Sequence, residues 1–163
     1  MTKLLLFDLD ETLIHVKRDP EDQDSEVESF EPEVELPVFD PESGMFGKRY
    51  FSIRPFAREC LAFANKYFEV GVFTAGLQWF ADPILNYLDP KGTFIQHRFY
   101  RQHCSLLGEP DCQFYTKDLT ILRGIDYRKC LIVDNNIHSF ALNLENGIPV
   151  HDFFGNNNDK ALL

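Results

Sequence analysis

The chain has 163 residues, of which 44% are hydrophobic, and a formal net charge of −10. The sixteen Phe residues and this hydrophobic content indicate a globular protein, and the length predicts one domain over residues 1–163. The charge is uneven, because Asp19–Glu35 holds nine acidic residues and no Lys or Arg, while the remainder is nearly neutral. Without clustered Lys and Arg, direct nucleic-acid binding is not expected.

Cellular location is only coarsely indicated. No apolar run approaches the roughly 20 residues that a membrane span needs, and no signal-peptide pattern opens the chain, so we expect neither a span nor export. We interpret the four cysteines as reduced thiols of an intracellular, nuclear or cytoplasmic protein, and we expect a monomer. A zinc site is the alternative for some of them, although its spacing matches no usual ligand pair: His97, His103, Cys104 and Cys112.

The first predicted element is a buried strand over Lys3–Phe7, which ends abruptly on the carboxylates Asp8 and Asp10. An acidic and turn-rich insert over residues 19–47 follows. We interpret its acidic part as a solvated surface loop; the alternative is a loop beside the site that repels acidic substrates. Two alternating segments predict a hairpin: Val34–Val38 and Arg49–Ile53.

A helix is predicted to open at Arg54–Pro55, because Pro fits the first helical position. The second buried strand, Phe68–Phe73, ends at Thr74, and a helix from Trp79 to Leu88 follows. Residues 93–114 combine aromatic and turn residues. We expect this small insertion to form short antiparallel strands over one end of the sheet.

The last third of the chain predicts a short helix after Tyr115–Leu119 and two more strands, Lys129–Val133 and Gly147–Val150. A helix is expected to begin near Asn156 and to be cut off at Leu163. Strands and helices alternate along the chain. The sequence therefore predicts an α/β fold, with a Rossmann-like, mostly parallel sheet and helices on both faces.

Three of the predicted strands end in polar clusters: Asp8/Asp10, Thr74 and Asp134/Asn135. Because the carboxyl ends of parallel strands share one edge, we expect these side chains to converge. Oxygen ligands without His or Cys suit Mg²⁺. An Asp can attack phosphorus to form an aspartyl-phosphate, and a second acid can protonate the leaving alcohol and then activate water. This set of residues predicts Mg²⁺-dependent phosphoryl transfer.

The segment Phe7–Leu13 matches the DxDx(T/V) signature of haloacid-dehalogenase-type phosphatases. With three later motifs it resembles the FCP/SCP (NIF-type) protein serine phosphatases, which act on the RNA polymerase II C-terminal domain. Those motifs are Phe73–Ala75, Tyr115–Leu119 and Val133–Asn135. The resemblance covers nearly the whole chain and implies a phosphoprotein or phosphopeptide substrate. Two alternatives stay open: a weakly active or inactive peptide-binding relative, and a small-molecule phosphatase of the wider superfamily.

The resemblance also implies a role for each matched residue. Asp8 is expected to be the nucleophile and Asp10 the general acid/base, while Thr74 and Lys117 bind the phosphoryl group. Asp8, Asp10 (through its backbone carbonyl) and Asn135 are expected to hold Mg²⁺, supported by Asp134. Substrate contacts are expected at Arg101, Leu77 and Phe80.

The chain departs from the family's pattern at a few positions. Gly76 stands where Ser is usual, Phe80 where Tyr is common, and Arg18 where an apolar side chain is common. These departures bear on the peptide substrate and leave the expected chemistry unchanged.

Overall fold

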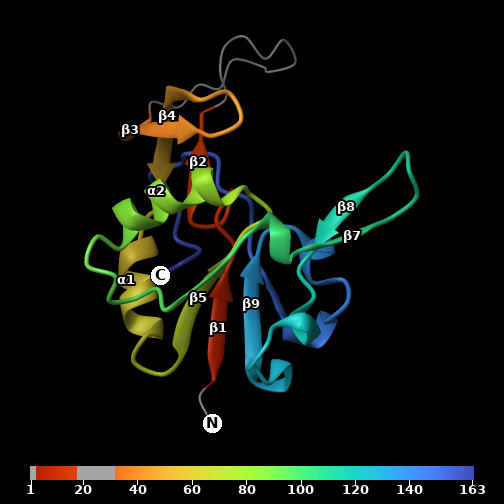
Figure 1. The fold of residues 1–163 in the computed structure, drawn as a ribbon. Helices are drawn as coiled ribbons and strands as arrows, with labels where there is room; N and C mark the ends of the chain where they lie inside the picture. Colours follow the sequence, from red (N-terminus) through yellow and green to blue (C-terminus); the bar gives the residue numbers. More distant parts are fainter. Residues whose placement is uncertain (1–2, 18–31) are drawn as a thin grey trace.

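The computed structural model describes residues 3–17 and 32–163, and its centre is a five-stranded parallel sheet (Figure 1). The strand order is β10-β9-β1-β5-β6. This architecture confirms the predicted α/β fold with a parallel sheet. The bounds are as follows: β1 (Leu4–Phe7), β5 (Glu69–Phe73), β6 (His97–Phe99), β9 (Cys130–Asp134) and β10 (Gly147–Pro149).

Strand β6 corrects the interpretation of residues 93–114. His97–Phe99 does not belong to an antiparallel insertion; it pairs in parallel with Gly71–Phe73 of β5 and forms one edge of the central sheet. Three residues are too short to show a periodicity, so the sequence pattern could not identify this strand.

Strand β1 lies in the middle of the sheet, between β5 and β9. Its side chains alternate between two cores: Leu6 packs in a cluster with Phe73, whereas Phe7 packs in a cluster with Val72. A strand that is covered on both faces has no polar side chains to alternate with apolar ones. That is why the segment is a continuous apolar run in the sequence.

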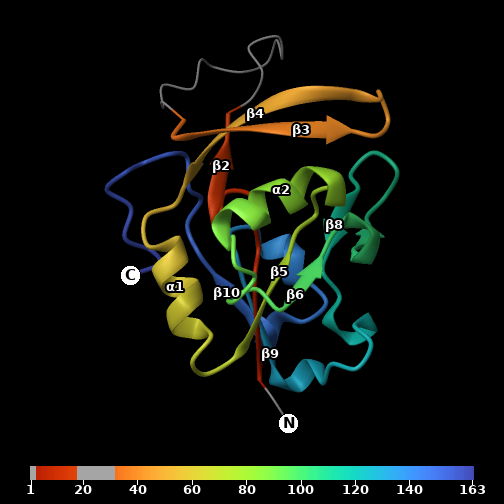
Figure 2. The same ribbon diagram turned by 60° about the vertical axis from the view of Figure 1, so that its left-hand side comes forward.

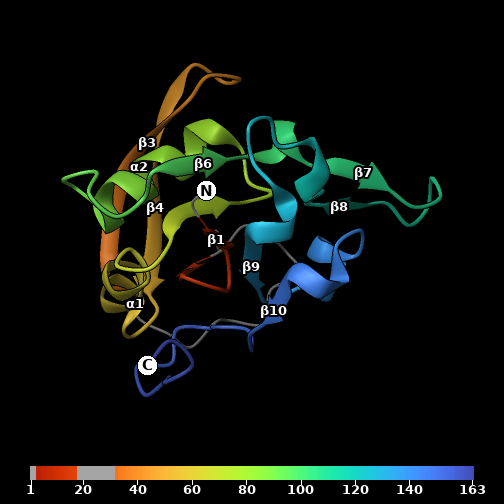
Figure 3. The ribbon, with the colours of Figure 1, turned by 90° about the horizontal axis from the view of Figure 1, so that it is seen from below.

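The two faces of the sheet are covered by different kinds of helix (Figure 3). The α-helices α1 (Ala57–Ala64) and α2 (Gln78–Leu88) contribute to the core that contains Phe7. The 3₁₀ helices η2 (Leu119–Ile121) and η4 (Ile137–Phe140) contribute to the other core. Three further 3₁₀ helices are short: η1 (Arg101–His103), η3 (Tyr127–Lys129) and η5 (Leu144–Asn146).

Two antiparallel additions extend from this body. Strands β2 (Ile14–Val16), β3 (Val34–Asp40) and β4 (Met45–Ile53) form a sheet that contains the predicted hairpin, and β3 packs on α2 (Figure 2). Strands β7 (Ser105–Leu107) and β8 (Phe114–Thr116) form a second hairpin, which projects from the body in Figures 1 and 3.

Two sequence predictions concern the acidic stretch and the C-terminal residues. Arg18 and most of the acidic stretch lie in residues 18–31, outside the described part of the chain. Residues 156–163 form turns where a helix was expected to begin. Within the described residues no helix is long and apolar enough to cross a membrane.

Candidate active site

The chain turns sharply where β1 ends, and this turn presents two aspartates at the edge of the sheet. Asp8 continues the sheet pairing, because its N–H donates to the carbonyl of Val133 at 2.8 Å. The carbonyl of Leu9 then accepts from the N–H groups of Leu13 and Ile14 at 2.9 and 3.1 Å, which closes the turn. Glu11 takes a left-handed φ of 56° inside it.

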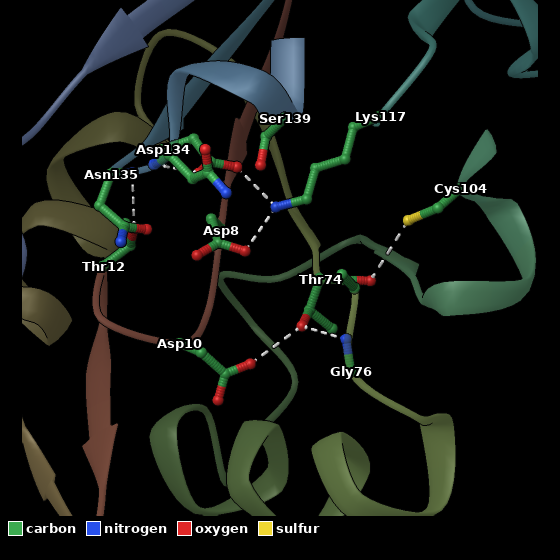
Figure 4. A network of polar contacts seen from close by, with 12 residues as sticks. Asp8, Asp10, Thr12, Thr74, Gly76, Cys104, Lys117, Asp134, Asn135 and Ser139 are labelled. Carbon is green, nitrogen blue, oxygen red and sulfur yellow. Dashed lines mark hydrogen bonds and ion pairs between the residues drawn. The ribbon is translucent and has the colours of Figure 1, made fainter. Parts of the chain in front are cut away.

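The centre of the site is a buried ion-pair triad (Figure 4). Lys117 Nζ donates to Asp8 Oδ1 at 2.5 Å and to Asp134 Oδ2 at 2.6 Å. These three side chains are 6%, 1% and 1% exposed for Asp8, Lys117 and Asp134. Lys117 follows directly after β8, and its backbone N–H donates to the carbonyl of Ser139 at 2.6 Å. The triad joins the ends of β1, β8 and β9.

The charges in this site do not balance. Burial raises the pKa of Asp8 to about 7, although Lys117 opposes the shift. Burial also raises the pKa of Asp10 to about 6, with a further contribution from Glu11. Burial by itself would lower the pKa of Lys117, but the facing carboxylates of Asp8 and Asp134 keep it above its usual value. Three carboxylates thus face one ammonium group, an excess of negative charge that a cation would compensate.

Asp10 meets the second predicted strand end. Thr74 Oγ1 donates to Asp10 Oδ2 at 3.2 Å and accepts from the N–H of Gly76 at 2.8 Å. A Cβ on Gly76 would lie 3.1 Å from Thr74 Oγ1, so the absence of a side chain at this position gives the hydroxyl room. The structure therefore brings Thr74 and Asp10 together as the strand-end argument predicts.

Asn135 lies on the other side of the turn and is bound by Thr12. Thr12 Oγ1 donates to Asn135 Oδ1 at 3.1 Å and accepts from the Asn135 N–H at 3.2 Å. Asp134 is fixed separately, because its second oxygen accepts from the N–H of Asn136 at 2.8 Å. Both oxygens of Asp134 are therefore hydrogen-bonded within the protein.

The donor set fits a hard divalent cation. The predicted ligands are the carboxylate of Asp8, the backbone carbonyl of Asp10 and the amide oxygen of Asn135, all of them oxygen atoms. The excess buried negative charge at the same place favours a cation on electrostatic grounds. Across the described residues, no group of three His, Cys, Asp or Glu side chains is arranged to hold a metal.

The alternative zinc ligands are engaged elsewhere. His97 Nε2 contacts Glu69 at 2.8 Å, and His103 Nδ1 accepts from the N–H of Tyr100 at 3.0 Å. Cys104 donates weakly to the carbonyl of Thr74 at 3.9 Å, and Cys112 is exposed. The structure does not assemble these residues into a zinc site.

The three residues predicted to contact substrate lie in or beside the segment that follows Thr74, and none of them belongs to the ion-pair triad. Arg101 Nε donates to the carbonyl of Ala75 at 2.7 Å, and its guanidinium lies 5.2 Å from the centre of the Tyr115 ring. Leu77 and Phe80 lie at the start of α2. The guanidinium of Arg49 lies 5.9 Å from the Phe80 ring centre, so the first turn of α2 contacts the β3–β4 hairpin.

Sequence reasoning assigned no role to four residues that support the site. Thr12 binds Asn135, and fully buried Arg54 donates to the carbonyl of Thr12 at 3.2 Å and pairs with Asp159 at 2.8 Å. Asp152 accepts from Asn135 Nδ2 at 2.7 Å. Arg54–Pro55 was visible only as a helix start. Asp159 lies 105 positions from Arg54, and no sequence signal links Asp152 or Asp159 to the site.

Comparison with known proteins assigns the chain to a phosphatase family. Residues 3–163 match the family described as NLI interacting factor-like phosphatase, and the chain belongs to this family. It is 38% identical over 161 residues to CTD small phosphatase-like protein 3 of Caenorhabditis elegans, covering 98% of this chain and 50% of the relative. It is 31% identical over 162 residues to CTD nuclear envelope phosphatase 1B of Danio rerio, and this match covers 99% of this chain and 63% of the relative.

The fold agrees with solved structures. The structure titled as Fcp1, an essential RNA polymerase II CTD phosphatase, superposes with a TM-score of 0.71 at 21% identity, covering 93% of this chain and 42% of that one. The chain spans half or less of the first curated relatives in length, since the matched shares are 50%, 25% and 47%. This likeness shows that the chain shares the fold of that structure.

Proposed function

We propose that this protein is a Mg²⁺-dependent phosphoprotein phosphatase that hydrolyses phosphoserine or phosphothreonine through an aspartyl-phosphate. The observation that carries the proposal is the buried triad of Asp8, Lys117 and Asp134 at the carboxyl edge of a parallel sheet. It supports the proposal because an acid at the end of a strand, fixed by a buried cation, has one defined orientation toward an incoming group.

In the first step, a carboxylate oxygen of Asp8 attacks phosphorus and forms a P–O bond, while the bond to the serine or threonine oxygen breaks. Asp10 gives its proton to that leaving oxygen. The raised pKa of Asp10, about 6, suits a group that must hold a proton near neutral pH and then release it. Lys117 and the hydroxyl of Thr74 bind the oxygens of the phosphoryl group.

In the second step, Asp10 accepts a proton from water, which attacks phosphorus. The P–O bond to Asp8 breaks, inorganic phosphate leaves, and both carboxylates return to their starting states. The contact of Thr74 Oγ1 with Asp10 Oδ2 at 3.2 Å supports this assignment, because the proposed acid lies beside a proposed phosphoryl-binding group. The hydroxyl would turn from Asp10 to a phosphoryl oxygen when substrate binds.

Asp8, the backbone carbonyl of Asp10, and Asn135 would hold Mg²⁺ in this proposal, with Asp134 in support. The cation would neutralise charge on the phosphoryl oxygens and on the excess carboxylates. It would also hold Asp8 ionised, counteracting the burial that raises its pKa.

A phosphoprotein is the preferred substrate class, because the relatives that match nearly the whole chain are named as CTD phosphatases. The RNA polymerase II C-terminal domain is the first substrate to test. The alternatives remain a weakly active or inactive peptide-binding relative and a small-molecule phosphatase. We propose a monomer in the nucleus or the cytoplasm; neither direct nucleic-acid binding nor a membrane span is part of the proposal.

The test is hydrolysis of p-nitrophenyl phosphate and of a phosphopeptide array, each with chelator and after Mg²⁺ is restored. We expect activity to vanish with chelator and to return with Mg²⁺. Hydrolysis that resists the chelator would refute the metal role. Turnover of p-nitrophenyl phosphate without turnover of any phosphopeptide would favour a small-molecule substrate, and no turnover of either would favour the peptide-binding alternative.

A further inference from the structure

We propose that Asp152 is a positioning residue, which orients the amide of Asn135 so that its oxygen is available to a divalent cation. The inference rests on the proposed function, since Asn135 is a proposed Mg²⁺ ligand. Asp152 stands outside the recognised motifs, and it is joined to Asn135 only by the fold: Asn135 Nδ2 donates to Asp152 Oδ1 at 2.7 Å.

An Asn side chain has a donor end and an acceptor end, and only the acceptor end can bind a cation. An ionised carboxylate accepts hydrogen bonds and donates none. Asp152 can therefore bind only the NH₂ end of the Asn135 amide. The oxygen end then lies at Thr12, which donates to it at 3.1 Å, and Thr12 belongs to the turn that carries Asp8 and Asp10.

The amide oxygen keeps a binding site for the cation. A carbonyl oxygen has two lone pairs, and Thr12 uses one of them. Thr12 cannot decide the amide orientation alone, because a hydroxyl can donate or accept and would also accept from an NH₂ group. The carboxylate of Asp152 removes this ambiguity.

Asp152 is exposed, but its backbone is fixed on both sides. The N–H of Val150 donates to the carbonyl of Asp134 at 3.1 Å, and the N–H of Phe153 donates to the carbonyl of Glu11 at 2.8 Å. Phe153 is 1% exposed, and the guanidinium of Arg54 lies 5.5 Å from its ring centre. The segment is thus fixed to β9 on one side and, through Glu11, to the turn after β1 on the other.

The test measures Mg²⁺ affinity directly, by isothermal titration calorimetry on the protein without substrate. We expect Asp152→Ala to weaken Mg²⁺ binding by about 10-fold, the lower end of the range for residues that orient metal ligands. Asp152→Asn should lie between the wild type and Asp152→Ala, because its amide can still accept from Asn135 Nδ2 but can also donate to Asn135 Oδ1. The control is Asp111→Ala at the exposed tip of the β7–β8 hairpin, which removes the same charge and should leave the affinity unchanged.

A second background separates orientation from charge. In Asn135→Asp the ligand has two equivalent oxygens and no orientation to fix, so adding Asp152→Ala should not weaken Mg²⁺ binding and should strengthen it by removing a like charge. A further loss in this background would overturn the inference, and so would equal losses in Asp152→Ala and Asp152→Asn. If Asn135→Ala binds Mg²⁺ as tightly as the wild type, then Asn135 is not a ligand and the inference fails.

The outcomes also separate this inference from the proposed function. Wild-type protein that binds no Mg²⁺ would overturn both. Wild-type protein and Asp152→Ala that bind Mg²⁺ equally well would overturn the positioning role alone. Thermal unfolding of each variant shows whether the fold is intact, and we expect every variant to unfold at a temperature close to that of the wild type.

Discussion

At the carboxyl edge of the central sheet charged side chains are buried, whereas at the tip of the β3–β4 hairpin apolar side chains are exposed. Lys117 and Asp134 are each 1% exposed, while Met45 and Phe46 are 66% and 77% exposed. Buried charges fix geometry but cost desolvation energy, and exposed apolar groups add little to stability. The geometry of the sheet edge is therefore tightly constrained, whereas the surface at the hairpin tip tolerates substitution.

The same contrast is present in two ion pairs of nearly equal length. Lys117 lies 2.5 Å from Asp8 with both side chains buried, and Lys48 lies 2.6 Å from Glu35 with 64% and 48% exposure. Distance alone would rate the two pairs alike. Burial makes the first one indispensable once it has formed, because either partner alone would be an unpaired charge away from water.

The largest expected effect is on turnover. Asp8→Asn removes the proposed nucleophile and should lower kcat for p-nitrophenyl phosphate by roughly 10,000-fold or more. Because the variant also removes one carboxylate from a site with excess negative charge, its thermal unfolding temperature should not fall. Asp111→Asn is the control at an exposed position. Residual activity near the wild-type rate would exclude Asp8 as the nucleophile.

The second prediction compares the two ion pairs. Lys117→Met leaves Asp8 and Asp134 buried without their cation and should lower the free energy of unfolding by about 3–5 kcal/mol, measured with urea. Lys48→Met should cause no measurable change, because its pair is exposed and screened by water. Equal losses for the two variants would show that burial does not separate the two regions.

The third prediction concerns Arg54, which is buried against the turn that carries Asp8 and Asp10. The hydrogen bond from Arg54 lowers the pKa of Asp159 below its usual 3.8, so the stabilisation is complete above that pH and is lost as the pH falls below about 4. Asp159→Asn should show a shallower loss of stability in this acid range. Asp159→Ala should lower the free energy of unfolding by about 3 kcal/mol at neutral pH, because Arg54 loses its partner.

The matched control for that pair is Asp126→Ala, which breaks the exposed Arg128–Asp126 pair. We expect a loss of no more than about 1 kcal/mol there, because the ion pair is exposed and Asp126 otherwise only accepts from the Arg128 N–H at the start of η3. If the acid unfolding transition of Asp159→Asn is identical to that of the wild type, then another carboxylate controls this transition.

The fourth prediction tests the hydroxyl at the end of β5. Thr74→Ala removes a proposed phosphoryl-binding group and the bond to Asp10, and should lower kcat by about 100-fold. Thr74→Ser keeps the hydroxyl and should retain most of the activity. If the Ser variant is as slow as the Ala variant, then the methyl group and its packing matter more than the hydroxyl.

The smallest effect is expected at the hairpin tip. Phe46→Ala should change the free energy of unfolding by no more than about 0.5 kcal/mol, and p-nitrophenyl phosphate turnover should be unchanged. Phe51 lies in the same strand but is fully buried, so Phe51→Ala should cost about 3–5 kcal/mol. A large loss in Phe46→Ala would show that the exposed tip is part of the stable core.

Strand ends were the part of the site that sequence pattern could predict. An apolar run that stops at Asp8, Thr74 or Asp134 is visible in the sequence, and parallel pairing brings the three ends to one edge. Lys117 was predicted only from the family resemblance, because nothing local separates it from a solvent-facing lysine. The structure places it against Asp8, 109 residues away.

The supporting residues could not be predicted, for a physical reason. The contacts of Thr12 with Asn135, and of Arg54 with Asp159, join residues 123 and 105 positions apart and depend on how the final turns pack. In the fold, the short strand β6 and the 3₁₀ helices were missed or placed approximately. Elements of three or four residues carry too little periodicity to be identified.

The central position of β1 has a consequence for how the protein is made. As the chain leaves the ribosome, β1 emerges first, and β5 can pair with one of its edges well before β9 exists to cover the other. Until residue 134 emerges, an apolar strand therefore has an open edge, which is a template for pairing with other chains. We expect nascent chains stopped before Cys130 to depend on chaperones, and released fragments of that length to aggregate.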